Sequence, residues 1–170
     1  MLMATPNRMV NTMSDPHDIF KKLNLKDPHP KALILNAPKS YEPVIAAYAG
    51  EVHREPKDGP YGFVQVFGTT NAELREAARV GAAAVEPQGL LWLCYPKKSS
   101  KAHQNSDCSR DTVAVMLAEE GYEPVRQIAI DDDWSALRFK KPEDIKRMVR
   151  TWAVTEEGKR KAEKSRQASN

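Results

Sequence analysis

The chain has 170 residues, 41% of them hydrophobic and 29% charged, which is typical of a globular protein that buries one core. A net charge of +3 is too small to indicate nucleic-acid binding by itself, and two cysteines are too few for a disulfide framework. No apolar run reaches the roughly 18 residues of a membrane span, so we expect a cytoplasmic protein without a membrane-spanning segment.

The N-terminal part predicts a leader followed by a helix and a strand. Residues 1–17 carry four methionines among polar residues and prolines, and we interpret them as a disordered leader. Residues 18–25 predict a short helix with Asp18 as its N-cap. Residues 31–36 form a short apolar run bounded by prolines, which is typical of a buried parallel strand.

Strands and helices alternate through the middle of the chain. Residues 41–48 predict a helix, and residues 51–55 and 61–67 predict two strands. Residues 72–85 are rich in Ala, Glu and Arg and predict a helix capped by Asn71.

The next elements are a central strand and a further helix. Residues 90–95 are apolar at every position, which favours a strand buried on both faces. A long polar loop, residues 96–107, follows it, and residues 111–120 predict a helix that ends at Gly121.

A predicted hairpin over residues 122–139 is the most informative feature. Three aspartates, residues 131–133, favour a turn, because their side chains accept hydrogen bonds from nearby backbone amides. Period-2 alternation places Trp134 and Arg138 on one face of the second strand and Leu137 on the other.

The C-terminal part is basic. Residues 138–166 hold eleven Lys and Arg against five Asp and Glu. We expect a helix over residues 142–152 and a charged flexible tail over residues 154–170, so that residues 18–153 form a single α/β domain. The basic cluster raises nucleic-acid association as one hypothesis, although interleaved acidic residues favour a solvated helix face.

Taken together, these elements predict a three-layer, Rossmann-like α/β fold. Alternation of strands and helices implies a mostly parallel sheet with helices on both faces. The closing hairpin adds an antiparallel strand, as in methyltransferase-like sheets.

Loops at the carboxyl ends of the strands are the expected ligand site of such a sheet. The loop after residue 95 is rich in ammonium and hydroxyl donors, and the next helix begins beside a further donor. The predicted ligand-binding residues are Asn36, Lys97, Lys98, Ser99 and Arg110. Their ligand would be a small anion or the acidic surface of a partner.

Motifs of known chemistry are missing from the sequence. The predicted first loop, residues 36–39, has no glycine for close approach of a nucleotide cofactor, and neither a dinucleotide-binding nor a P-loop motif occurs. Glu55 could stand in for a ribose-binding acid, but a surface glutamate is the better interpretation. Turn formation explains residues 131–133, so we predict no metal site and no catalytic residue, and we leave the cofactor unknown.

A resemblance adds to this interpretation. It is carried by the runs at residues 23–25, 35–38, 95–97, 130–139 and 156–159. The chain resembles a family of small bacterial proteins of unknown function, most specifically at Asp133-Trp134-Ser135-Ala136-Leu137-Arg138-Phe139. The resemblance covers residues 20–159 and implies a bacterial cytoplasmic protein with a truncated Rossmann-like domain. It supplies no activity, so no catalytic residue is carried over.

The leading hypothesis from the sequence is a non-catalytic binding or regulatory protein. Donor-rich loops without a nucleophile and base pair are the reason for this choice. Two alternatives stay open: a divergent adenosylmethionine-dependent transferase, and nucleic-acid association through the basic C-terminal segment.

Overall fold

A computed structural model of the chain describes residues 15–25, 29–57, 59–145 and 153–169. Most of the predicted leader, residues 1–14, lies outside the described residues, as does the range 146–152 in the predicted helix 142–152. No helix in the described part of the chain is both long enough and apolar enough to cross a membrane.

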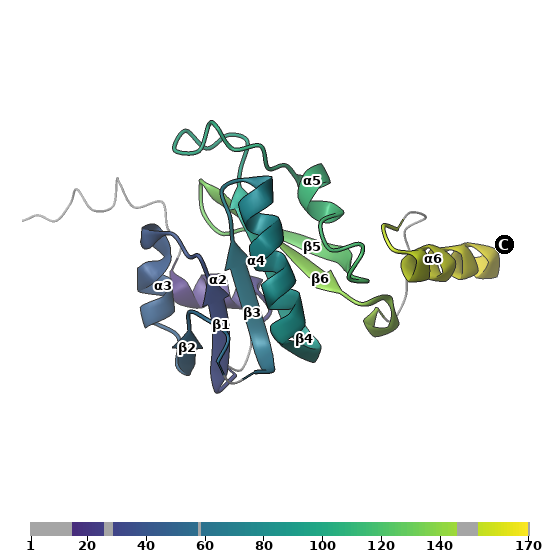
Figure 1. Cartoon of the computed structure of the whole chain (residues 1–170), viewed down its shortest axis with the longest axis horizontal. Coiled ribbons are helices and arrows are strands. Elements are labelled where there is room, and N and C mark those ends of the chain that lie inside the picture. The colour runs from purple at the N-terminus through teal and green to yellow at the C-terminus, as the bar shows by residue number, and fades with distance from the viewer. Residues whose placement is uncertain (1–14, 26–28, 58, 146–152, 170) are drawn as a thin grey trace, which may run out of the picture.

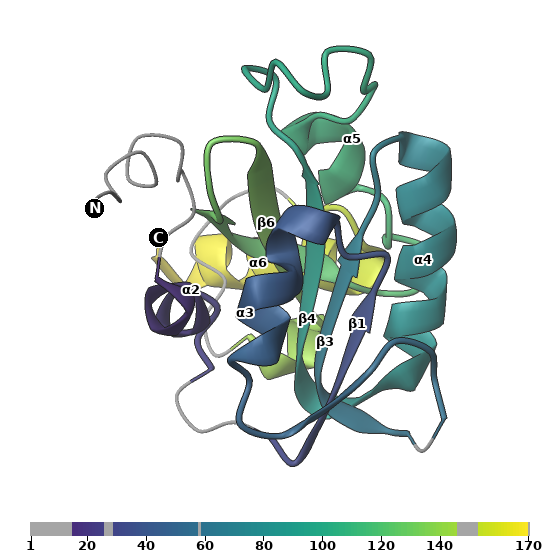
Figure 2. The same ribbon diagram turned by 90° about the vertical axis from the view of Figure 1, so that its left-hand side faces the viewer.

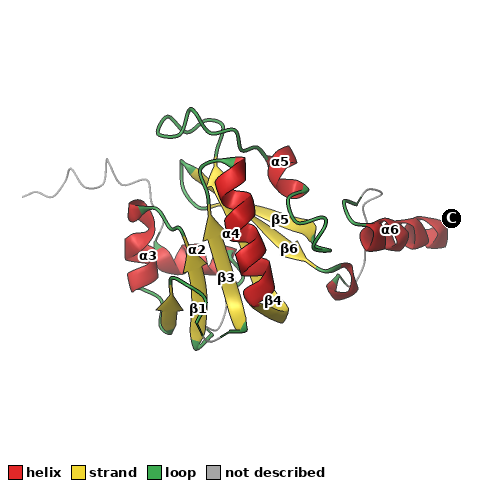
Figure 3. Ribbon diagram, in the orientation of Figure 1, coloured by secondary structure: helices red, strands yellow, loops and turns green. Residues whose placement is uncertain are grey.

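The strands form one six-stranded sheet in the order β2-β1-β3-β4-β6-β5 (Figures 1 and 3). β1 to β4 run parallel, whereas β6 lies antiparallel between β4 and β5. The strands are β1 Lys31–Leu35, β2 Glu51–His53, β3 Tyr61–Phe67, β4 Val85–Pro96, β5 Glu123–Ala129 and β6 Trp134–Lys140. This topology confirms the predicted Rossmann-like class with an antiparallel closing hairpin.

Helices cover both faces of the sheet (Figure 2). α4 and α5 pack on one face, and α2 and α3 pack on the other. The helices are α2 Pro16–Lys22, α3 Glu42–Ala46, α4 Asn71–Ala84, α5 Arg110–Ala114 and α6 Glu156–Ser169, with short 3-10 turns η1 Lys39–Tyr41 and η2 Pro142–Asp144.

The central strands divide their side chains between the two cores. Along β6, Leu137 belongs to the core under α4, whereas Trp134 and Ala136 belong to the core under α2. The predicted alternation of the hairpin is therefore confirmed. β4 alternates in the same way, and its Trp92 side chain is fully buried, with the indole N–H donating to the carbonyl of Leu23 at 3.1 Å.

Two helix starts differ from the prediction because a neighbouring residue provides the better cap. α2 begins at Pro16, since the Asp15 carboxylate accepts from the amide of His17 at 2.8 Å, so Asp18 is not the cap. α4 is capped by Thr70, whose hydroxyl accepts from the amide of Glu73 at 3.2 Å.

The lengths of α5 and β4 also differ from the prediction. α5 ends at Ala114 instead of residue 120, and turns continue the chain to residue 121. β4 begins at Val85, because the chain passes directly from α4 into the strand, with Gln88 at a φ of 66°. The strand therefore begins five residues before the predicted start at residue 90.

The C-terminal residues form helix α6, where the sequence predicted a flexible tail. The carboxylate of Glu123 is fully buried and accepts from the amides of Val154 at 2.9 Å and Thr155 at 2.7 Å. The Thr155 hydroxyl also donates to it at 2.7 Å and accepts from the amide of Gly158 at 2.8 Å. These bonds anchor the first turn of α6 to β5, which composition alone does not reveal.

Candidate functional site

Three loops leave the carboxyl ends of β1, β3 and β4 at the same edge of the sheet. β1 pairs with β3 and β3 with β4, all parallel, so their ends lie in a row. The long loop after β4 extends beyond the end of the sheet at which α4 begins (Figure 1). Ligands of open α/β sheets bind at this edge, so a functional site is expected among these three loops.

The loop after β1 is closed by a buried tyrosine. Tyr41 is 2% exposed, its ring lies 4.9 Å from that of Phe67, and its hydroxyl donates to Gln65 Oε1 at 3.0 Å. Burial raises the pKa of the Tyr41 hydroxyl well above its usual range. Asn36 takes a left-handed conformation with a φ of 59°, and Pro38 offers no backbone N–H.

The loop after β3 is shaped by the close approach of α4. A Cβ at Gly68 would lie 2.6 Å from the Cα of Leu74, so only glycine fits without displacement of the helix. The carboxylate of Glu73 accepts from the amide of Thr69 at 2.7 Å and from its hydroxyl at 3.1 Å. These bonds hold Thr69 at the carboxyl edge.

The loop after β4 is tied to the hairpin turn. The amide of Lys97 donates to the carbonyl of Asp133 at 2.8 Å, and the Ser100 hydroxyl donates to Asp133 Oδ1 at 2.7 Å. Asp131 Oδ1 accepts from the amides of Asp133 at 2.8 Å and Trp134 at 2.9 Å. The aspartates thus form a turn as predicted. Among the described residues no group of three His, Cys, Asp or Glu is placed to hold a metal ion.

A polar cavity of about 340 Å³ lies between the loop after β3 and the loop after β4. Its lining is Thr69, Thr70, Lys101, Ala102, His103, Gln104, Asn105 and Ser106. The ring of His103 lies 5.1 Å from that of Trp134, which in turn lies 5.3 Å from Phe67. The cavity therefore lies beside a row of aromatic side chains that ends at Tyr41.

The five predicted ligand-binding residues do not line this cavity, and they stay a prediction. Asn36, Lys98, Ser99 and Arg110 are exposed, and Lys97 is half-buried. Asn36 follows β1, which β3 separates from β4, so it lies apart from the lysines. The cavity is lined by the second half of the loop after β4, residues 101–106, for which the sequence carried no signal beyond polarity.

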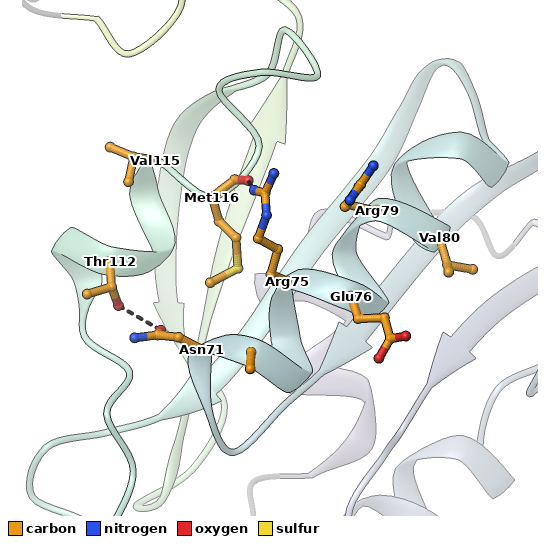
Figure 4. Close-up of a pocket in the computed structure, with 9 residues that line it drawn as sticks. Asn71, Arg75, Glu76, Arg79, Val80, Thr112, Val115 and Met116 are labelled. Atoms are coloured by element: carbon orange, nitrogen blue, oxygen red, sulfur yellow. Dashed lines mark hydrogen bonds between the residues drawn. The ribbon is translucent and has the colours of Figure 1, made fainter.

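A larger groove of about 890 Å³ lies between α4 and α5 (Figure 4). The Arg75 side chain donates to the carbonyl of Met116 and pairs with Glu119 at 3.1 Å. Thr112 donates to Asn71 Oδ1 at 2.9 Å across the end of the groove. Because the groove lies on helix faces away from the strand ends, we favour the smaller polar cavity as the functional site.

Neither cysteine is suited to nucleophilic chemistry. Cys94 is fully buried and Cys108 is 1% exposed. Burial raises the pKa of the Cys94 thiol to about 12 and also raises that of Cys108. We expect both thiols of the folded protein to resist Ellman's reagent at about pH 8 and both to react in denaturant. Rapid stoichiometric labelling of the folded protein would contradict this expectation.

Several solved structures are similar to this chain, and three of them are methyltransferases. A SAM-dependent methyltransferase from Aquifex aeolicus superposes with a TM-score of 0.53 and 14% identity over 79% of this chain and 92% of the other. Mitomycin 7-O-methyltransferase MmcR gives a TM-score of 0.51 and 9% identity, with 74% of this chain matching 53% of the other. N-methyltransferase NodS from Bradyrhizobium japonicum WM9, solved with S-adenosyl-L-homocysteine, gives a TM-score of 0.48 and 9% identity, with 75% of this chain matching 85% of the other.

Comparisons with protein-family models and with curated protein sequences found no match. The fold is therefore established by structural likeness alone, at sequence identities too low to carry over any residue role.

This comparison corrects the leading hypothesis from the sequence. The prediction of a non-catalytic binding or regulatory protein for a small anion or an acidic partner is contradicted, because a solved structure that shares the fold over most of both chains is a SAM-dependent methyltransferase. The error arose from treating the missing glycine-rich turn as evidence against an enzyme. The alternative of a divergent adenosylmethionine-dependent transferase is better supported.

Adenosylmethionine does not fit the loop after β1, whereas the polar cavity has room for a small molecule. The loop after β1 does not offer a glycine-lined approach, since residues 36–39 contain no glycine and Pro38 lacks a backbone N–H. The polar cavity beside Thr69 and His103 does offer room, at the lower end of the size of small-molecule sites.

Proposed function

We propose that this chain is a divergent adenosylmethionine-dependent transferase. The observation that carries the proposal is the insertion of β6, antiparallel, between β4 and β5 in an otherwise parallel sheet. This order, together with the superposition on the Aquifex aeolicus enzyme over most of both chains, supports the assignment.

The polar cavity is the proposed binding site. Thr69 and Thr70 bound it on the side of β3, and His103, Gln104 and Asn105 bound it on the side of the long loop. Hydroxyl, amide and imidazole groups can hydrogen-bond the polar groups of a nucleoside. Adenosylmethionine, when bound, supplies a methyl group carried on a positively charged sulfonium.

Calorimetric titration with adenosylmethionine and S-adenosylhomocysteine tests the proposal. We expect saturable binding of both, and a loss of about fivefold in affinity for Gln104→Ala, since each lost hydrogen bond is worth about 1 kcal/mol. Arg79→Gln, on the groove between α4 and α5, is the matched control and should bind like the parent chain. Absence of heat with either compound at millimolar concentration would reject the proposal.

A further inference from the structure

Two arginines face each other on the closing hairpin. Arg126 on β5 and Arg138 on β6 are directly opposite in the antiparallel register, and Trp92 on β4 is opposite Arg138 on its other side. Directly paired residues of neighbouring strands point to the same face of a sheet. Both guanidinium groups therefore extend from the face to which Trp92 belongs, with Arg126 exposed and Arg138 half-buried.

These arginines differ from others in the described part of the chain. Four arginines pair with a carboxylate: Arg54 with Glu42, Arg75 with Glu119, Arg79 with Glu120 and Arg160 with Glu157. By contrast, Arg138 Nε is buried, and no described residue provides it with a hydrogen-bond acceptor. Burial lowers the pKa of Arg138, and the charge of Arg126 lowers it further.

Such an arrangement is costly without a negative group. Like charges directly opposite on neighbouring strands repel each other, and a buried N–H without an acceptor loses its hydration without compensation. A bound phosphate would remove both costs. Its double negative charge balances the two guanidinium groups, and its oxygens can accept hydrogen bonds from the N–H groups of both. A single carboxylate balances only one of the two charges.

We propose that Arg126 and Arg138 form a phosphate-binding site on the β5–β6 hairpin, on the face to which Trp92 belongs. The site is separate from the polar cavity: Arg138 follows Trp134 by four residues along β6, which places it about 13 Å from the carboxyl edge. It therefore does not depend on the proposed transferase function. The phosphate group belongs either to a small molecule or to a nucleic-acid backbone.

Thermal unfolding of the full chain, with inorganic phosphate, pyrophosphate and a short single-stranded oligonucleotide as probes, tests the site. We expect at least one probe to raise the unfolding midpoint of the parent chain. Arg138→Gln and Arg126→Gln should each lower the affinity for that probe by about tenfold or more, because each removes a charge-assisted hydrogen bond. Arg79→Gln removes the same charge from a remote helix and should retain the response.

The probes distinguish the sources of the phosphate. A response to phosphate or pyrophosphate that is lost in both arginine variants supports a small phosphorylated ligand. A response to the oligonucleotide alone, also lost in both, supports a nucleic-acid backbone. No response to any probe, or a response that both variants retain, would overturn the site. If Arg138→Gln does not fold, the exposed Arg126 still provides the test.

Discussion

Replacement of Glu123 by alanine is expected to detach helix α6 from the sheet. The buried carboxylate accepts from Val154, from the amide of Thr155 and from its hydroxyl, and all three donors would lose their acceptor. Removing one partner of a buried, charged hydrogen-bond network typically costs about 3 kcal/mol. Hydrogen exchange followed by mass spectrometry should show faster exchange over residues 153–163, and urea unfolding should show the lower stability.

The control for this experiment is Glu157→Ala. Glu157 is exposed and pairs with Arg160 across one helical turn, so its loss should change the free energy of unfolding by less than about 0.5 kcal/mol. If Glu123→Ala left the exchange of α6 unchanged, the anchoring role of this carboxylate would be wrong.

Trp92→Ala should produce the other large effect. The indole extends from β4 and is fully buried, and its N–H donates to the carbonyl of Leu23, which follows α2. Truncation of a buried tryptophan leaves a large cavity and costs about 3–5 kcal/mol. Urea denaturation followed by circular dichroism should show this loss as a lower midpoint with little change in slope.

A graded variant keeps the measurement interpretable if Trp92→Ala does not fold. Trp92→Phe retains most of the buried ring and should cost distinctly less than the alanine variant. Val115→Ala, at a side chain that is 54% exposed, should stay within about 0.5 kcal/mol of the parent chain. Equal stability of Trp92→Ala and Val115→Ala would contradict the packing described for β4.

Strands with a strong local pattern were predictable from the sequence. The apolar run at residues 90–95 and the alternation around Trp134 and Leu137 both correspond to strands, β4 and β6, whose side chains divide between the two cores. Helix boundaries were less predictable, because they depend on contacts between distant residues. Asn71, expected to cap α4, instead donates to the carbonyl of Asp107 at 3.0 Å and accepts from Thr112.

The candidate site shows the same limit. Sequence periodicity placed the loop after residue 95 at the carboxyl edge of the sheet, and this loop lines one side of the cavity. Its lining depends on how the long loop folds back, which is set by the Ser100 bond to Asp133 and the Asn71 bond to Asp107. Those partners lie more than thirty residues apart. The closure by Tyr41 likewise required knowledge of Gln65 and Phe67 on another strand.

The ends of the sheet have a consequence for self-association in solution. β2 comprises only three residues, and β5 contains Pro124, a register shift before Arg126 and the exposed side chain of Arg126 itself. Short strands, prolines, bulges and charges all oppose the addition of a strand from a second molecule. Both margins of the sheet are thus poor templates for amyloid-like growth, so the folded chain should tolerate high concentration without assembling through its strands.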